Sequence, residues 1–294
     1  MTRHLPGLAA CLATIAVTLA GGCGSSVPNP PDPPTTTTST GTYVALGDSY
    51  TSGPNIPDVV QAACYRSSSN YPHQVAAQLD NTFLIDVSCA GAATPGMTED
   101  QSTGVSEEAP QLNAVTADTD LVTLGIGAND SHFFRSLVID CTKVLDRNPT
   151  GHPCRDMYVT DGQNELLPLV AEIQRNIQNV VRLIQHRAPE ARILLVGYPQ
   201  IVPATGTCDL LPLAAGDYPF VRDTFQKLID AQHEAADTTG VDYVDVEAAV
   251  SGHDICAPDP WIAGVVDHPG VAAAWHPYLA EQTAVADAIL DLVK

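Results

Sequence analysis

The sequence predicts an α/β fold in which a parallel β-sheet carries helices on both faces. Short apolar segments alternate with longer segments of helical periodicity, which is typical of strand–helix–strand units with right-handed crossovers. The apolar segments are rich in Val, Ile and Leu and show little polar alternation, as strands buried on both faces do. Five segments have this character: Thr42–Leu46, Phe83–Val87, Leu121–Gly125, Ile193–Val196 and Val241–Val244.

The clearest helix is expected at Glu165–His186. Its apolar residues recur at steps of three and four, which places them along one stripe of a helix. These residues are Leu166, Leu169, Val170, Ile173, Ile177, Val180, Val181 and Ile184. Further helices are expected at Tyr71–Leu79, Val221–Ala236 and Pro277–Val293. Since parallel α/β sheets bind ligands beyond the carboxyl ends of their strands, residues that follow the strands are the first candidates for a site.

Composition narrows the classes of function. The chain has 294 residues, of which 45% are hydrophobic, enough for one large core or at most two small ones. Its formal net charge is −21, which disfavours binding to nucleic acid and docking on anionic lipid through a basic patch. The sequence contains no phosphate-binding loop, dinucleotide fingerprint, C-x-x-C pair or H-x-x-x-H pair. We therefore expect neither a cofactor nor a metal. We also expect a monomer.

The N-terminal segment reads as a leader and a tether rather than as part of the fold. Within residues 1–23, the apolar run Leu8–Ala20 is too short to cross a bilayer, which takes about 20 residues, and fits a signal peptide. Small residues before Cys23 resemble a bacterial lipobox, although Leu19 lies one position early. We expect either a lipoprotein lipidated at Cys23 on the outer side of the cell membrane or a cleaved, secreted protein. Residues 24–41 are rich in Pro and Thr and predict an extended linker.

The cysteines predict disulfides. Cys11 and Cys23 belong to the leader, and six cysteines follow it: Cys64, Cys89, Cys141, Cys154, Cys208 and Cys256. An even set in an exported chain indicates three disulfides, because exported proteins fold in oxidising compartments. Six cysteines allow fifteen pairings, so spacing alone does not choose among them.

Ser49 is a candidate nucleophile. It follows the first predicted strand in the sequence Gly47-Asp48-Ser49, where a helix can begin. Its hydroxyl would then face the ligand-binding edge of the sheet, and its backbone N–H would be free to donate. A simple Gly-Asp-Ser turn is the alternative explanation of this triplet.

Two candidate hydrogen-bond donors follow the next strands. Gly91 comes after the second strand and, having no side chain, can present its backbone N–H closely to a substrate. Asn129 comes after the third strand, and its neutral amide can stabilise a tetrahedral oxyanion. A turn glycine and an Asn helix cap are the ordinary structural alternatives.

His276 is the candidate general base. It stands just before the last predicted helix, where the chain returns to the carboxyl edge of the sheet. From there its imidazole could accept the proton of Ser49. The alternative is a solvated histidine or a residue of the first helical turn.

The order Ser49, Gly91, Asn129, His276 resembles the SGNH, or GDSL, hydrolase family. The blocks that carry the resemblance are Val44-Ala45-Leu46-Gly47-Asp48-Ser49-Tyr50, Cys89-Ala90-Gly91, Gly125-Ile126-Gly127-Ala128-Asn129-Asp130 and His276-Pro277. The resemblance covers residues 42–294, the expected hydrolase domain. Arg66-Ser67, Tyr71-Pro72 and the six cysteines look like the actinobacterial secreted lipase and esterase branch.

The resemblance implies a flavodoxin-like three-layer α/β/α fold with a parallel five-stranded sheet. It implies that Ser49 attacks an acyl carbon, that His276 moves the proton, and that Ser49, Gly91 and Asn129 form the oxyanion hole. It also implies three sequential disulfides: Cys64–Cys89, Cys141–Cys154 and Cys208–Cys256.

The chain departs from the family at the group that orients the histidine. The family usually has an Asp three residues before the His, where this chain has Ala273. We expect the backbone carbonyl of Ala273 to orient His276, as some secreted members use a carbonyl. The alternative is a carboxylate from the preceding loop: Asp254, Asp259 or Asp267.

The expected activity is hydrolysis of carboxylic esters, with acyl esters or lipids as substrates. Deacetylation of carbohydrate or cell-wall polymer, and ligand binding by a catalytically weak surface lipoprotein, are the alternatives. The ordinary α/β-hydrolase fold is disfavoured because no Gly-x-Ser-x-Gly elbow occurs. Trp261, in the long loop before His276, could line an acyl-chain pocket or simply hold its loop in place.

Overall fold

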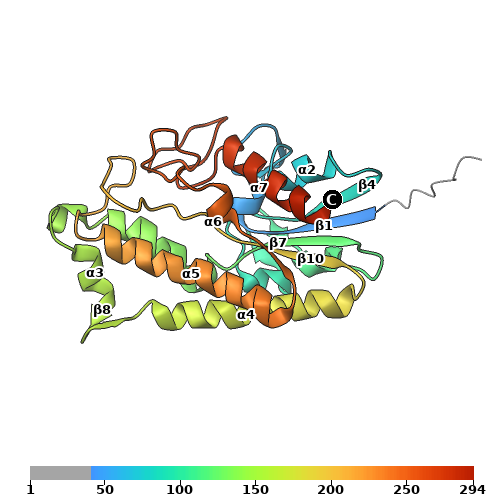
Figure 1. The fold of residues 1–294 in the computed structure, drawn as a ribbon, viewed down its shortest axis with the longest axis horizontal. Coiled ribbons are helices and arrows are strands. Elements are labelled where there is room, and N and C mark those ends of the chain that lie inside the picture. Colours follow the sequence, from blue (N-terminus) through green and yellow to red (C-terminus); the bar gives the residue numbers. More distant parts are fainter. Residues whose placement is uncertain (1–40) are drawn as a thin grey trace, which may run out of the picture. The chain divides into compact units, whose positions relative to one another are not determined.

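A computed structural model describes residues 41–294 of the chain and has a central five-stranded sheet (Figure 1). Its strands are β1 (Gly41–Gly47), β4 (Thr82–Asp86), β7 (Leu121–Gly125), β10 (Arg192–Val196) and β11 (Asp242–Val244). Every neighbouring pair is parallel, and the spatial order is β11-β10-β7-β1-β4. This is the flavodoxin-like order, and it confirms the predicted fold class. The direction of winding changes between β1 and β7, where folds of this kind bind ligands.

Helices cover both faces of the sheet (Figure 1). On one face lie α4 (Leu167–Arg187) and α5 (Tyr218–Thr239), and on the other lie α2 (Tyr71–Ala76) and α7 (Leu279–Val293). Alternate residues of the strands serve the two layers. In β1, Val44 and Leu46 face α4 and α5, whereas Tyr43 and Ala45 face α2 and α7. Because both faces are buried, the strands read as continuous apolar runs in the sequence.

Short elements fill the connections between these units. The helices among them are α1 (Ser49–Ser52), α3 (Pro153–Tyr158), α6 (Val246–Ala249), the 3₁₀ turns η1 (Thr94–Met97), η2 (Gln111–Ala114), η3 (Asp130–His132) and η5 (Leu145–Arg147), and the π-helical turn η4 (Arg135–Asp140). Three small hairpins pair β2 (Val59–Gln61) with β3 (Arg66–Ser67), β5 (Gln101–Ser102) with β6 (Glu107–Glu108), and β8 (Val159–Thr160) with β9 (Gln163–Asn164).

The five predicted strands agree with the structure to within one residue at each end, and the helix limits differ more. Helix α5 begins at Tyr218, three residues before the predicted start, and includes Pro219 in its first turn. Proline is tolerated there because the backbone N–H groups of the first turn have no partner within the helix. Helix α7 begins two residues later than predicted, because Pro277 instead forms an antiparallel bridge with Ile262.

The three predicted disulfide pairs are present: Cys64–Cys89, Cys141–Cys154 and Cys208–Cys256. None of the six cysteines lies in a strand of the main sheet, although Cys154 belongs to α3 and Cys141 directly follows η4. The predicted leader (residues 1–23) and the linker up to residue 40 lie outside the described residues, and Gly41 already belongs to β1. Within residues 41–294, no helix combines the length and the apolarity needed to cross a membrane.

Candidate active site

Ser49 is the first residue of α1, directly after β1. Asp48 caps this helix, and its Oδ1 accepts a hydrogen bond from the Tyr50 N–H at 2.9 Å. Gly47 is required by a close approach, since a Cβ there would lie 2.2 Å from Oγ1 of Thr51 and 2.7 Å from the Gly125 carbonyl oxygen. The strand-to-helix turn therefore places Ser49 at the carboxyl edge of the sheet, as predicted.

Gly91 lies in a segment that is held from two sides. The Cys64–Cys89 disulfide fixes its start, Cys89 N–H donates to the Gly47 carbonyl at 3.0 Å, and Ala90 N–H donates to the Cys64 carbonyl at 3.0 Å. Gly91 itself has φ +77°, a left-handed conformation in which a side chain would be strained. This conformation and its place on the pocket wall agree with the predicted backbone donor.

Asn129 follows β7, and its Nδ2 donates to the Ala92 carbonyl at 2.9 Å. It makes no side-chain cap to η3, so the helix-cap alternative does not describe it. The bond to Ala92 ties the Asn129 side chain to the Gly91 segment. Because a side-chain amide has two N–H groups, one remains for a ligand.

Asp130 is a buried residue that the sequence reasoning did not single out. Its carboxylate accepts hydrogen bonds from Thr94 N–H (2.7 Å), Thr94 Oγ1 (2.5 Å) and Asn176 Nδ2 (3.1 Å). It therefore joins the loop of Asn129 to the turn that follows Gly91 and to α4. Its position next to Asn129 in the Gly-x-Asn-Asp block was the available signal.

His276 reaches the pocket from the segment before α7. Its Nδ1 lies 2.7 Å from the carbonyl oxygen of Ala274. A carbonyl only accepts, so Nδ1 carries the proton and Nε2 is left as the acceptor. Burial lowers the pKa of His276, while the Ala274 carbonyl and the charge of Asp267 oppose that change.

The prediction that the Ala273 carbonyl orients His276 is wrong by one residue. The Ala273 carbonyl instead accepts from the backbone N–H of His276 at 3.1 Å. Trp275, which stands between Ala274 and His276, has φ +67°, a conformation uncommon outside glycine. This turn brings the carbonyl of Ala274, rather than that of Ala273, to the imidazole.

The three aspartates considered as alternatives are engaged elsewhere. Asp267 lines the pocket, but its Oδ1 accepts from the Ala274 N–H at 2.8 Å. Asp254 accepts from the Cys256 N–H at 2.8 Å. Asp259 lies 3.5 Å from Nδ1 of His253, whose ring stacks on Trp261 with centroids 3.6 Å apart. Trp261 is thus a residue that holds its loop, and it does not line the pocket.

Tyr50 links the nucleophile segment to the histidine segment and was not predicted. Its hydroxyl donates to the Trp275 carbonyl at 2.8 Å, and its ring lies 5.7 Å from the His276 ring between centroids. Nε2 of Gln282, on α7, donates to the Tyr50 carbonyl at 2.9 Å. The position of His276 relative to Ser49 is therefore set by buried contacts.

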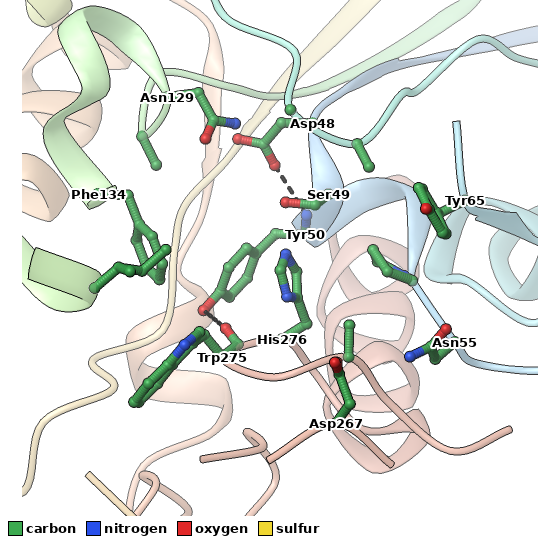
Figure 2. Close-up of a pocket in the computed structure, with 16 residues that line it drawn as sticks. Asp48, Ser49, Tyr50, Asn55, Tyr65, Asn129, Phe134, Asp267, Trp275 and His276 are labelled. Atoms are coloured by element: carbon green, nitrogen blue, oxygen red, sulfur yellow. Dashed lines mark hydrogen bonds between the residues drawn. The ribbon is translucent and has the colours of Figure 1, made fainter. Parts of the chain in front are cut away.

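All four predicted site residues line one cavity of about 500 Å³: Ser49, Gly91, Asn129 and His276. Figure 2 shows the His276 imidazole pointing toward Ser49, with Asn129 on the opposite side of Ser49. Apolar side chains, among them Phe134, Ile139 and Trp275, line the same cavity. Within residues 41–294, no group of three or more His, Cys, Asp or Glu side chains could hold a metal ion. The arrangement suits attack by a hydroxyl on a carbonyl carbon, with donors for the resulting oxyanion.

Comparison with known proteins assigns the chain to a family. A profile of the GDSL-like lipase/acylhydrolase family matches residues 45–278, which include all four site residues. The chain belongs to this family. Lipase 2 of Streptomyces coelicolor is 38% identical to this GDSL hydrolase over 262 residues, which cover 87% of this chain and 84% of that protein. An esterase of Streptomyces scabiei is 31% identical over 305 residues, covering 91% of this chain and 84% of that protein.

Solved structures give the same assignment. Phospholipase A1 from Streptomyces albidoflavus NA297 superposes with a TM-score of 0.72 and 26% identity, covering 87% of this chain and all of that chain. The extracellular lipase from Streptomyces rimosus superposes with a TM-score of 0.65 and 25% identity, covering 86% and 100%. This GDSL hydrolase is thus a serine ester hydrolase of the lipase and esterase type.

Proposed function

We propose that Ser49 and His276 hydrolyse carboxylic esters through an acyl-enzyme. Oγ of Ser49 attacks the acyl carbon while its proton passes to Nε2 of His276. The oxyanion accepts hydrogen bonds from the N–H groups of Ser49 and Gly91 and from Nδ2 of Asn129. Collapse expels the alcohol, which takes the proton from His276, and leaves the acyl group on Ser49. Water then attacks the acyl group with His276 as base, releasing the carboxylic acid and restoring Ser49.

The observation that carries this proposal is the meeting of the four groups in one cavity. They come from positions as distant along the chain as Ser49 and His276, and each lies where a strand or the final helix meets the carboxyl edge of the sheet. The bond between Nδ1 of His276 and the Ala274 carbonyl supports the role of base, because it leaves Nε2 free to accept the serine proton.

We propose acyl esters with hydrocarbon chains, including lipids, as the substrate class. The oxyanion occupies the side of Asn129 and Gly91, and the alcohol must leave on the side of His276, which protonates it. The acyl chain then takes a remaining direction. We assign to it the apolar wall of Phe134 and Ile139, which line the cavity. The name of the Streptomyces albidoflavus phospholipase A1 agrees with an acyl substrate of this kind.

We propose that the enzyme acts outside the cell as a monomer. Three disulfides favour an oxidising compartment, and the Streptomyces rimosus relative is named an extracellular lipase. All proposed catalytic groups come from one chain. A lipid anchor at Cys23 is the form of export that the lipobox-like sequence favours. Metabolic labelling with palmitate tests this anchor, because labelling should vanish in Cys23→Ala and persist in Ser49→Ala.

A fluorophosphonate probe tests the nucleophile. The probe should label the folded wild-type protein, and Ser49→Ala should remove the label while leaving the thermal midpoint near that of the wild type. Ser52→Ala is the matched control, because Ser52 lies on the same helix, is buried and does not line the pocket. An unlabelled folded wild-type protein would contradict the enzyme mechanism and favour a ligand-binding lipoprotein.

A substrate series tests the acyl wall. We expect kcat/KM on p-nitrophenyl esters to rise from acetate to medium chains, and Phe134→Ala to shift the preference toward longer chains. Acetylated sugars should be poor substrates. A preference for acetylated sugars over butyrate and octanoate esters would instead identify a carbohydrate deacetylase.

A further inference from the structure

Tyr198 joins two of the three segments that carry the proposed oxyanion donors, those of Ser49 and Asn129. It follows β10, and only 1% of its surface is exposed. Its hydroxyl donates to Oδ2 of Asp48 at 2.5 Å and accepts from the backbone N–H of Ala128 at 3.1 Å. Asp48 precedes Ser49, and Ala128 precedes Asn129. One buried hydroxyl thus lies between the two segments.

The two ends of this connection are themselves fixed. Oδ1 of Asp48 accepts from the Tyr50 N–H at 2.9 Å, and the Asp48 N–H donates to the Gly125 carbonyl at 3.0 Å. Asp48 therefore has both carboxylate oxygens engaged, although it is almost completely buried. Any shift of the Tyr198 hydroxyl would be transmitted directly to the residues beside Ser49 and Asn129.

Tyr198 is held from behind by α5. Its N–H donates to Oε1 of Gln232 at 3.1 Å, and Nε2 of Gln232 donates to the Ile126 carbonyl at 3.2 Å. Its ring packs edge-on against Tyr50, with centroids 5.4 Å apart. These contacts leave the phenol little freedom, so its hydroxyl defines a fixed point between the loops.

The phenol is suited to this place because it keeps its proton. Burial, followed by the charge of Asp48, raises the pKa of Tyr198 well above its usual value, so the hydroxyl remains a donor to Asp48. The same oxygen offers lone pairs to the Ala128 N–H. No apolar side chain could satisfy both buried groups, and leaving either unpaired would cost free energy.

We propose that Tyr198 is a positioning residue that sets the separation between the Ser49 N–H and the Asn129 amide. This inference rests on the proposed oxyanion hole. It assigns to the hydroxyl no contact with substrate, since Tyr198 does not line the cavity. Oxyanion donors act by being held in advance where charge develops, so a small displacement weakens binding of the transition state more than binding of the ground-state ester.

The test is Tyr198→Phe, with Tyr43→Phe as the matched control. Tyr43 is also fully buried, and its hydroxyl shares a hydrogen bond of 2.9 Å with Oγ1 of Thr123. It faces the opposite helical layer and does not line the cavity. Both variants therefore lose one buried tyrosine hydroxyl, but only Tyr198→Phe removes the hydrogen bonds that join the segment of Ser49 to that of Asn129.

For p-nitrophenyl butyrate we expect Tyr198→Phe to lower kcat at least tenfold with KM changed less than threefold. Affinity for an alkylboronic acid, which forms a tetrahedral adduct on the serine, should fall by a similar factor. Tyr43→Phe should keep kcat and boronate affinity within about twofold of wild type, even if it lowers the thermal midpoint as much as Tyr198→Phe does. Should Tyr198→Phe fail to fold, Asp48→Asn replaces it. With the amide oxygen kept on the Tyr50 N–H, the amide NH2 group faces the Tyr198 hydroxyl and cannot accept its proton.

Equal kcat losses in the Tyr198 and Tyr43 variants would reduce Tyr198 to a stabilising residue and overturn the inference. Unchanged kcat and boronate affinity in Tyr198→Phe would do the same. Failure of the proposed mechanism looks different. In that case the wild-type protein itself neither hydrolyses the ester nor reacts with the fluorophosphonate.

Discussion

Nδ1 of His276 lies 2.7 Å from the carbonyl oxygen of Ala274, at the place where a Ser-His-Asp triad has a carboxylate. The carbonyl holds the imidazole in the tautomer that the proposed mechanism needs. As a neutral dipole it stabilises the imidazolium less than a carboxylate would. The carboxylate of Asp267 acts on the same segment indirectly, by accepting the Ala274 N–H at 2.8 Å. Under the proposed mechanism, this GDSL hydrolase works with a Ser-His pair that its own backbone supports.

Asp267→Ala should keep most of the activity. We expect kcat/KM to fall less than about fivefold, because the Asp267 carboxylate contacts the backbone of Ala274 rather than the imidazole. His276→Ala should lower kcat about a thousandfold or more, since it removes the base. Steady-state kinetics on one ester measure both variants. Comparable losses from the two changes would show that Asp267 belongs to a triad.

The pH dependence of kcat/KM should have its acidic midpoint below the ordinary histidine pKa of 6.5, because burial lowers the pKa of His276. Only the neutral imidazole accepts the serine proton, so activity rises as the pH rises through this midpoint. The negative charge of Asp267 opposes the lowering. Asp267→Asn should therefore move the midpoint to still lower pH.

The comparison of wild type with Asp267→Asn also separates His276 from a second titrating group. Burial raises the pKa of Asp48 to about 7, and Asp48 titrates in both proteins. The difference between the two pH profiles reports on His276. A midpoint that stays fixed, or that rises, in Asp267→Asn would contradict this assignment.

Asn129→Ala should lower kcat by about a hundred- to a thousandfold, the usual effect of removing one oxyanion-hole donor. KM should change little, because the lost hydrogen bond is strongest in the transition state. Asn129→Asp is a sharper variant, since its carboxylate would repel the oxyanion, and it should be less active than Asn129→Ala. Both variants can lose the hydrogen bond to the Ala92 carbonyl, and thermal midpoints measured beside the kinetics report how far this loss destabilises the fold. Activity within threefold of wild type in both variants would remove Asn129 from the oxyanion hole.

The sequence predicts the main sheet, and the place of Ser49, Gly91 and Asn129 beyond its strands, for the same reason. Strands buried on both faces leave continuous apolar runs, and their carboxyl ends must meet at one edge of a parallel sheet. Ser49 and Asn129 could be placed at that edge from their distance to the preceding strand alone. The pairing of the cysteines needed the family resemblance, because six cysteines permit many arrangements.

The supporting contacts could not be predicted because they join distant segments through buried side chains. Tyr198 contacts Asp48 across 150 positions, and no local pattern marks either residue for this bond. The carbonyl that orients His276 belongs to Ala274 rather than to Ala273, and the local cause of this difference is equally invisible in the sequence. It depends on the left-handed backbone of Trp275, and a tryptophan in the sequence gives no indication of that conformation.

Glu281→Gln should stabilise the enzyme at alkaline pH. Glu281 lies in the first turn of α7 with 2% of its surface exposed, and its carboxylate accepts a hydrogen bond of 2.8 Å from Nε2 of Gln282. Burial raises its pKa from 4.5 to about 8. Between these values the folded protein binds a proton that the unfolded chain releases, so this group makes the free energy of unfolding fall as the pH rises through that window.

A glutamine cannot ionise, so the variant lacks this loss. At pH 9 we expect it to exceed the wild type by about 1–3 kcal/mol, or a thermal midpoint higher by several degrees, with a much smaller difference at pH 4.5. Glu172→Gln, at an exposed position on α4, is the control and should show the same small effect at both pH values. Thermal unfolding followed by circular dichroism measures all three proteins. A gain that is equal at pH 4.5 and pH 9 would mean that better packing of the amide, rather than the buried charge of Glu281, is responsible.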